Sequence, residues 1–92
     1  MHGAATTEKP LARPDVALRR VGSEWVLFDA GRDRAHVLNL TAAVVWTYCD
    51  GDHEPAAIAG AIAGDLRAAE PATIRHDIDD VLRRFAAEGL LQ

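Results

Sequence analysis

The sequence predicts an α+β domain in which a three-stranded antiparallel sheet is followed by three helices. Residues 16–40 carry short extended patterns rich in β-branched and aromatic residues, separated by turn signals. From residue 41 onward, apolar residues recur at helical spacing instead. The chain has 92 residues, which is enough for one small domain and too few for two.

Three segments are predicted to be strands. Val16–Val21 comes first and ends at a Gly-Ser turn signal. Glu24–Asp29 reads EWVLFD and places apolar side chains on both faces, which suggests that something also covers the second face. Residues 30–35 are expected to form a hairpin loop, and residues 36–40 the third strand. Such short connections favour an antiparallel meander.

Three helices are predicted to follow. Thr41 is the expected N-cap of the first, and Gly51 its expected end. The other two are expected to begin near Pro55 and Pro71, because proline suits a first helical position. Gly89 is the expected C-cap of the last helix, with the leucines after it folded back onto the core. The apolar stripes are Val44, Val45, Tyr48 and Cys49 in the first helix, Ile58, Ile62 and Leu66 in the second, and Ile74, Ile78, Val81, Leu82 and Phe85 in the third.

Residues 1–14 are expected to be a flexible tail ahead of a domain at 15–92, since they hold two prolines and almost nothing to bury. The lack of an apolar run after Met1, together with a single cysteine, leads us to expect a cytoplasmic protein. The longest apolar stretch is about half of the roughly 20 residues that a membrane-spanning helix needs, so no membrane partner is expected.

The formal net charge is -4, and it is uneven. From residue 50 onward nine acidic residues face four arginines. This acidic half argues against nucleic acid as the main partner.

Catalytic or metal-binding patterns are not apparent. The four histidines are scattered without the i, i+4 spacing of a helical metal site. Cys49 lies on an apolar stripe and is best interpreted as a buried, inert thiol. The acidic run at 77–80 directs its side chains to different faces of a helix, which indicates a solvated surface. We therefore expect neither an enzyme nor a cofactor.

The stretch HVLNLTAAVVWTYCDG, residues 36–51, changes from a strand pattern to a helix pattern without a loop. This corner would hold an edge strand rigidly beside a helical wall. No proline interrupts residues 34–40, so the strand could accept an extended peptide by strand addition. From these patterns alone, a buried strand in a purely structural domain explains the segment equally well.

The same stretch resembles the signature of the PqqD family, the small peptide chaperones first named in pyrroloquinoline quinone biosynthesis. The matching parts are Leu-Asn and Thr-Ala at 38–42 and Cys-Asp-Gly at 49–51. IAGAIAGDL is similar to the family's second helix, and DIDDVLRRFAAEGLLQ to its third helix and Gly-Leu-Leu ending. The resemblance covers about residues 16–92.

This resemblance implies a winged helix-turn-helix-like fold and a non-enzymatic RiPP recognition element in natural-product biosynthesis. Such a domain recognises the leader of a ribosomally synthesised, post-translationally modified peptide (RiPP). The leader would pair with the third strand, Arg34–Leu40, in a groove walled by one flank of the third helix. We choose the flank that mixes one apolar position with charges of both signs over the one with Arg75, Leu82 and Ala86. The implied peptide-binding residues are Arg34, Ala35, His36, Val37, Leu38, Asn39, Asp77, Val81, Arg84 and Glu88.

The implied partners are the precursor leader peptide and a modifying enzyme, such as a radical SAM enzyme, a cyclase or a leader peptidase. Free edge strands also allow a homodimer. Two alternatives remain open at this point. The chain could be a small assembly subunit that binds a folded modifying enzyme and ignores the leader. It could also be a winged-helix DNA-binding protein, although residues 71–88 hold three arginines against four acidic residues.

Overall fold

The computed structural model describes residues 9–66 and 71–92. Six elements follow one another along the chain: β1 (Val16–Val21), β2 (Glu24–Asp29), β3 (Arg34–Leu38), α1 (Leu40–Thr47), α2 (Pro55–Leu66) and α3 (Pro71–Ala87). The predicted α+β class, with three strands before three helices, is confirmed. Winged helix-turn-helix describes the arrangement only loosely.

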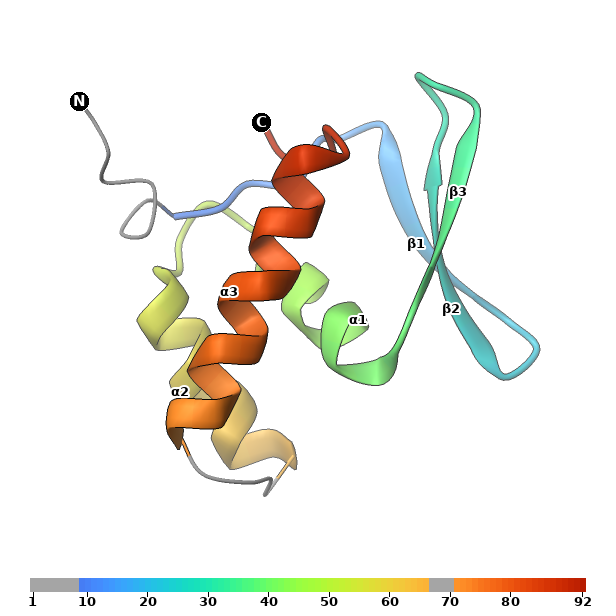
Figure 1. The fold of residues 1–92 in the computed structure, drawn as a ribbon. Coiled ribbons are helices and arrows are strands. Elements are labelled where there is room, and N and C mark those ends of the chain that lie inside the picture. Colours follow the sequence, from blue (N-terminus) through green and yellow to red (C-terminus); the bar gives the residue numbers. More distant parts are fainter. Residues whose placement is uncertain (1–8, 67–70) are drawn as a thin grey trace.

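The sheet has the strand order β1-β2-β3, and both pairings are antiparallel. In its middle, Leu27 of β2 opposes Leu18 of β1 on one side and His36 of β3 on the other. Figure 1 shows the sheet at one side of the helices, with α1 beginning where β3 ends and with α2 and α3 packed side by side. Both β1 and β3 are therefore edge strands.

The core lies between the sheet and the helices. Leu27 and Leu38 contribute to it from the sheet, and Phe85 contributes from α3. Trp46 of α1 meets the Phe85 ring edge to face, with 5.3 Å between the ring centroids. Such aromatic pairs add roughly 0.5–1.5 kcal/mol to the stability gained from buried area.

The buried stripe of α1 differs from the predicted one. Trp46 is buried, whereas Val44 and Tyr48 are only half-buried. Ala42, Val45, Trp46 and Cys49 make the observed stripe, at i, i+3, i+4 and i+7. The sequence prediction chose the neighbouring stripe because α1 is apolar nearly all round, so that periodicity alone does not fix its orientation.

The N-cap of α1 is Asn39, and the prediction of Thr41 was wrong. The Asn39 side-chain oxygen accepts a hydrogen bond from the Ala42 amide at 2.8 Å, and its main-chain oxygen accepts one from Ala43 at 3.0 Å. Asparagine is among the strongest N-caps, so the helix starts two residues earlier than predicted. The third strand consequently ends at Leu38 and not at residue 40.

The C-caps gave one correct and one wrong prediction. Gly89 has a φ of 70° and donates to Ala86, while the Leu90 amide donates to Phe85 at 2.9 Å, which together form a Schellman motif. Leu90 is fully buried, as predicted. Gly51 does adopt a positive φ, but α1 has already ended at Thr47, so this glycine serves the following turn.

Residues 10–13 are tied to the domain, in contrast to the flexible tail predicted for 1–14. The Ala12 amide donates to Cys49 at 2.8 Å, and the Gly51 amide donates to Pro10 at 2.9 Å. On the other side, the Gln92 amide donates to Leu11 at 2.8 Å. This segment therefore joins the loop after α1 to the C-terminal residues. Residues 1–8 lie outside the described part of the chain.

The outer face of the sheet is partly open, which corrects the prediction that something covers it. Val26 on this face is buried, but Phe28 is 38% exposed and Val37 is 55% exposed. The described helices pack on the opposite face, where Leu27 is completely buried. Apolar residues on both faces of β2 thus mark a central strand, not a second layer.

Candidate functional site

The polar main-chain groups of β3 alternate between the sheet and its open edge. Across the β1–β2 hairpin, the Ala30 amide donates to the Asp15 carbonyl at 3.2 Å, so the even-numbered residues of β2 direct their main chain toward β1. The odd-numbered residues of β2 therefore direct their main-chain groups toward β3, where they pair with even-numbered residues such as His36. Ala35 and Val37 are left with amide and carbonyl groups that point away from the sheet.

The side chains of β3 alternate between the two faces of the sheet. Leu38 is buried in the core and His36 is largely buried, so the even-numbered side chains face the helices. Arg34 shares this face at the start of the strand and is exposed. Ala35 and Val37 lie on the outer face and are exposed. One strand thus directs main-chain groups outward along its edge and places Arg34, His36 and Leu38 toward the helices.

Arg84 of α3 and Glu88, the residue that follows α3, contact β3 directly. His36 Nδ1 lies 2.6 Å from Glu88 Oε2. Arg84 Nε donates to Glu88 Oε1 at 3.1 Å, and Arg84 Nη2 reaches the Val37 carbonyl oxygen at 3.4 Å. These side chains bridge the space between strand and helix. We call the main chain of Ala35 and Val37, together with His36, Arg84 and Glu88, the β3 edge site.

The other predicted residues occupy less central positions. Val81 is half-buried against the core, nearly one turn before Arg84 on the same flank of α3. Asp77 is exposed one turn before Val81, toward the start of α3. The side chain of Asn39 caps α1, so this residue belongs to the corner and not to the strand. The structure thus brings Arg84 and Glu88 to β3, and leaves Asp77 at a distance along the helix.

Two arginines that the sequence analysis missed fasten α3 beside β3. Arg32, in the β2–β3 loop, donates to the Glu88 carbonyl at 3.0 Å. Arg13 donates to the Gly89 carbonyl at 2.9 Å and forms an ion pair with the fully buried Asp29 at 3.2 Å. The last carbonyl groups of a helix lack partners within the helix and carry partial negative charge, so guanidinium groups stabilise them. No sequence signal identifies these pairings, because the partners lie far apart in the chain.

Cys49 has no role in the site. Burial, and after it the negative charge of Asp50, raise the pKa of the Cys49 thiol to about 12. Its Sγ donates to the Val45 carbonyl within α1, at 3.3 Å. The thiol is therefore protonated at neutral pH and unreactive, as predicted.

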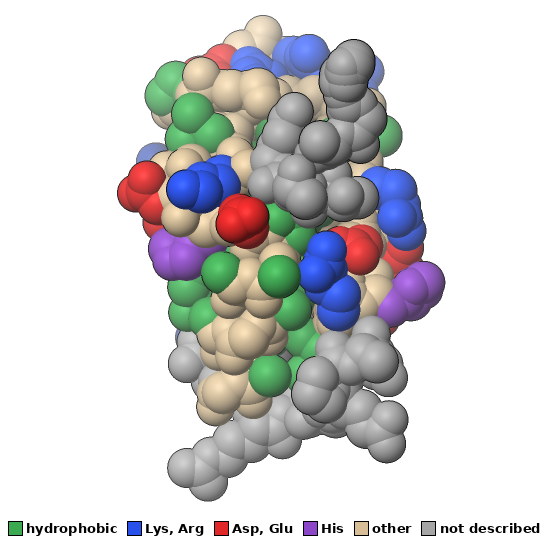
Figure 2. Space-filling model, turned by 90° about the vertical axis from the view of Figure 1, so that its left-hand side faces the viewer, with side chains coloured by type: hydrophobic (Ala, Val, Ile, Leu, Met, Phe, Trp, Pro, Cys, Tyr) green, Lys and Arg blue, Asp and Glu red, His purple; other side chains and the backbone are tan. Residues whose placement is uncertain are grey.

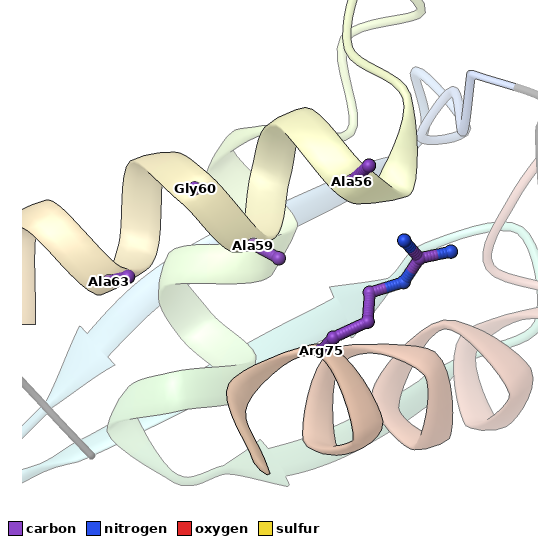
Figure 3. A pocket seen from close by; sticks show the side chains of 5 residues that line it. All are labelled: Ala56, Ala59, Gly60, Ala63 and Arg75. Carbon is purple, nitrogen blue, oxygen red and sulfur yellow. The ribbon is translucent and has the colours of Figure 1, made fainter. Parts of the chain in front are cut away.

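A hollow of about 340 Å³ lies between α2 and α3 (Figure 3). Its lining is Ala56, Ala59, Gly60, Ala63 and Arg75. Arg75 points toward α2, and its Nε donates to Asp79 at 3.1 Å. The remaining lining is alanine and glycine, which offers a ligand no further polar side chain. Arg75 belongs to the flank of α3 that we did not choose, and that flank turns toward α2.

Within the described residues, no group of three or more His, Cys, Asp or Glu side chains is placed to hold a metal ion. None of the described helices has the length and apolar character to cross a membrane. Figure 2 shows the face of the molecule farthest from the sheet, where basic and acidic side chains are interspersed. The described part of this face therefore does not gather basic residues into one patch, as a DNA-binding surface does.

Comparison with known proteins gives a consistent picture. Residues 24–91 match the family described as Coenzyme PQQ synthesis protein D (PqqD). No curated protein matches the chain. One similar solved structure is TbiB1 in complex with the TbiA(beta) leader peptide, with a TM-score of 0.74 and 22% identity over 89% of this chain and 94% of that one. Another is lasso peptide synthetase B1 complexed with the leader peptide, with a TM-score of 0.76 and 21% identity over 91% of this chain and 98% of that one.

Proposed function

The chain belongs to the PqqD family, and we propose that it is a non-enzymatic module that binds the leader of a ribosomally synthesised precursor peptide. The leader pairs with the open edge of β3 as an added strand, and the module presents the precursor to modifying enzymes. The main-chain groups of Ala35 and Val37, which point away from the sheet beside α3, are the observation that carries this proposal. Both similar structures are complexes with leader peptides, which supports it.

Main-chain pairing at this edge provides a moderate affinity. Each hydrogen bond contributes about 0.5–1.5 kcal/mol net, and ordering an unfolded leader costs roughly 2–5 kcal/mol. Side-chain contacts are needed to supply the remainder. They come from the helix-facing row of β3, from the flank of α3 that carries Val81 and Arg84, and from Glu88 just after this helix. A moderate affinity allows the precursor to be released after modification.

The predicted contact residues differ in how they take part. Ala35 and Val37 provide main-chain groups, while Arg34 and His36 provide side chains that face α3. Leu38 is buried and supports the strand from beneath. Asn39 contributes through its main chain only, because its side chain caps α1. Asp77 contacts only a leader that is long enough to extend past Val81.

The chemistry on the precursor is performed by a second partner, such as a radical SAM enzyme, a cyclase or a leader peptidase. The exposed outer face of the sheet, with Phe28 and Val37, remains accessible while a leader occupies the β3 edge. The outer face is therefore the surface that we assign to the enzyme. A homodimer through a sheet edge would compete with the leader for the same main-chain groups.

The proposal is tested by titrating the ¹⁵N-labelled full chain with a synthetic peptide. Its sequence is that of the leader of the precursor gene nearest to this one in its genome. We expect the largest amide shifts at Ala35, Val37 and Arg84, with little change at Arg20 on the opposite edge of the sheet. Shifts centred on another surface, or none at millimolar peptide, would refute strand addition at β3. Binding to the modifying enzyme without any response to the peptide would instead indicate an assembly subunit.

A further inference from the structure

We propose that the β3 edge site selects leaders in which an acidic side chain faces α3 opposite His36, and that this carboxylate takes over Arg84 from the Val37 carbonyl. The inference rests on the proposed function and specifies the class of leader. It starts from the contacts of Arg84. In the unbound protein its guanidinium donates to the Val37 carbonyl, the acceptor that an added strand would need.

Three arginines lie at this end of the site. Arg84 donates to the Glu88 carboxylate, Arg32 donates to the Glu88 main-chain carbonyl, and Arg34 is exposed at the start of β3. The chain as a whole carries a formal charge of -4. Exposed arginines beside one strand of an otherwise acidic protein favour an acidic segment there over the rest of its surface.

Strand addition deprives Arg84 of a partner. The amide of an incoming strand takes the Val37 carbonyl oxygen, which Arg84 Nη2 holds at 3.4 Å. Among the described residues, Arg84 Nη2 has no other hydrogen-bond acceptor. Glu88 accepts from Arg84 Nε through Oε1, and its buried Oε2, which lies 2.6 Å from His36 Nδ1, makes no hydrogen bond. The guanidinium would then be covered by the leader with unused donors, which is unfavourable for a charged group. A carboxylate on the leader removes this cost, because it accepts two parallel hydrogen bonds from one guanidinium.

The alternation of a strand determines where the acidic residue lies. The leader residue opposite Val37 turns its side chain to the outer face, as Val37 does. Its neighbours, opposite His36 and Leu38, face α3. The position opposite His36 lies between Arg34, two residues back on the same face, and Arg84 on the helix. The position opposite Leu38 lies toward Val81, which favours an apolar side chain.

The preferred leader therefore carries an acidic and an apolar residue two positions apart, in either order according to the strand direction. His36 is a second reason to expect a polar leader residue at the position opposite it. Its Nε2 atom is buried and has no hydrogen-bond partner among the described residues. Buried polar atoms in native proteins are nearly always satisfied, so an incoming polar group improves this environment.

The test uses random dodecapeptides displayed on phage and selected on the immobilised full chain. Three proteins are compared: the wild type, the double variant R34Q/R84Q, and the control double variant R19Q/R83Q. The control removes the same charge from an exposed position on β1 and from an exposed position on α3 away from the site. We expect the acidic–x–apolar spacing, or its reverse, to be enriched on the wild type and on the control but not on R34Q/R84Q.

A selected peptide then serves for a double-mutant cycle by calorimetry. Replacing its acidic residue with the matching amide should weaken binding to the wild type about fivefold to tenfold, and binding to R34Q/R84Q hardly at all. If selected peptides shift the amides of β3 but show no acidic preference, or keep it on R34Q/R84Q, this inference is wrong and the proposed function stands. If no selected peptide shifts the amides of β3, both are wrong.

Discussion

The two edges of the sheet differ in what surrounds them. Both β1 and β3 direct main-chain groups away from the sheet, and by the same alternation those of β1 belong to residues such as Arg20. Arg20 turns back onto its own hairpin, where its Nε donates to Gly22 at 3.2 Å and its guanidinium lies 5.8 Å from the Trp25 ring centroid. At β3, in contrast, α3 lies beside the strand and Arg84 reaches the Val37 carbonyl.

This difference is why we assign the leader to the β3 edge and not to the β1 edge. Charged side chains such as Arg19 and Arg20 on an edge are a common protection against unwanted pairing. A guest on β1 would gain main-chain bonds only, which barely offset its ordering cost. Under the proposed function, a guest on β3 would gain the same bonds together with side-chain contacts to α3. The presence of α3 beside β3 therefore distinguishes the two edges, whereas the main-chain groups of β1 and β3 do not.

Proline substitution on each edge tests this comparison with the largest expected effect. Val37→Pro removes an outward amide and places a ring where the leader strand would lie, so leader affinity should fall at least tenfold. Arg20→Pro makes the same change on the β1 edge and should leave the affinity unchanged. Isothermal calorimetry with the synthetic leader measures both.

Thermal unfolding of the two proline variants provides the control for folding. Edge positions with outward amides tolerate proline, so both melting curves should remain cooperative. Ala35→Pro, at the other outward amide of β3, repeats the test if Val37→Pro folds poorly. Equal affinities for the β1 and β3 variants would remove the distinction between the edges.

The fold was largely predictable because each element has its own apolar period and its own terminal signal. Pro55 and Pro71 begin helices, and Gly89 ends one, as their fixed or permissive φ values suggest. The N-cap of α1 was misassigned because Asn39 and Thr41 are both good caps, and the choice depends on which oxygen reaches an amide of the first turn.

The candidate site was predictable only in part. The lack of proline in β3 and the family resemblance pointed to this strand, while its edge position follows from the sheet order. The fastening of α3 by Arg13 and Arg32 was not predictable, since these arginines bind main-chain carbonyls at the far end of the chain. Main-chain acceptors have no sequence signature. Whether the ten predicted residues contact a leader stays a prediction.

A second pair of variants compares the two flanks of α3, with a smaller expected effect. Val81 and Leu82 are both half-buried neighbours of the core, but Val81 lies on the flank of Arg84. Replacing either by alanine should lower the free energy of unfolding by about 1 kcal/mol, because the side chains are only partly buried. Val81→Ala alone should also weaken leader binding, by about threefold. Urea denaturation and calorimetry measure the two quantities, and a larger loss of affinity for Leu82→Ala would place the leader on the other flank.

The smallest expected effect concerns the loop after α1, which lies apart from both edges of the sheet. Lowering the pH should reduce the stability of this loop without changing the leader site. In the loop, the Asp50 carboxylate accepts hydrogen bonds from His53 and from the Asp52 amide, both at 2.9 Å, and these lower its pKa below the ordinary value. Because the folded-state pKa is the lower one, the stabilisation is complete above about pH 4 and is lost as the pH falls through the folded-state value. Asp50→Asn should therefore lower the melting temperature slightly at pH 6, and the difference from the wild type should shrink toward pH 2.5. Leader affinity at pH 6 should be the same for both proteins, since the loop lies outside the β3 edge site. A difference in melting temperature that is constant with pH would show that the carboxylate charge contributes nothing, and a change in affinity would show that the loop and the edge are coupled.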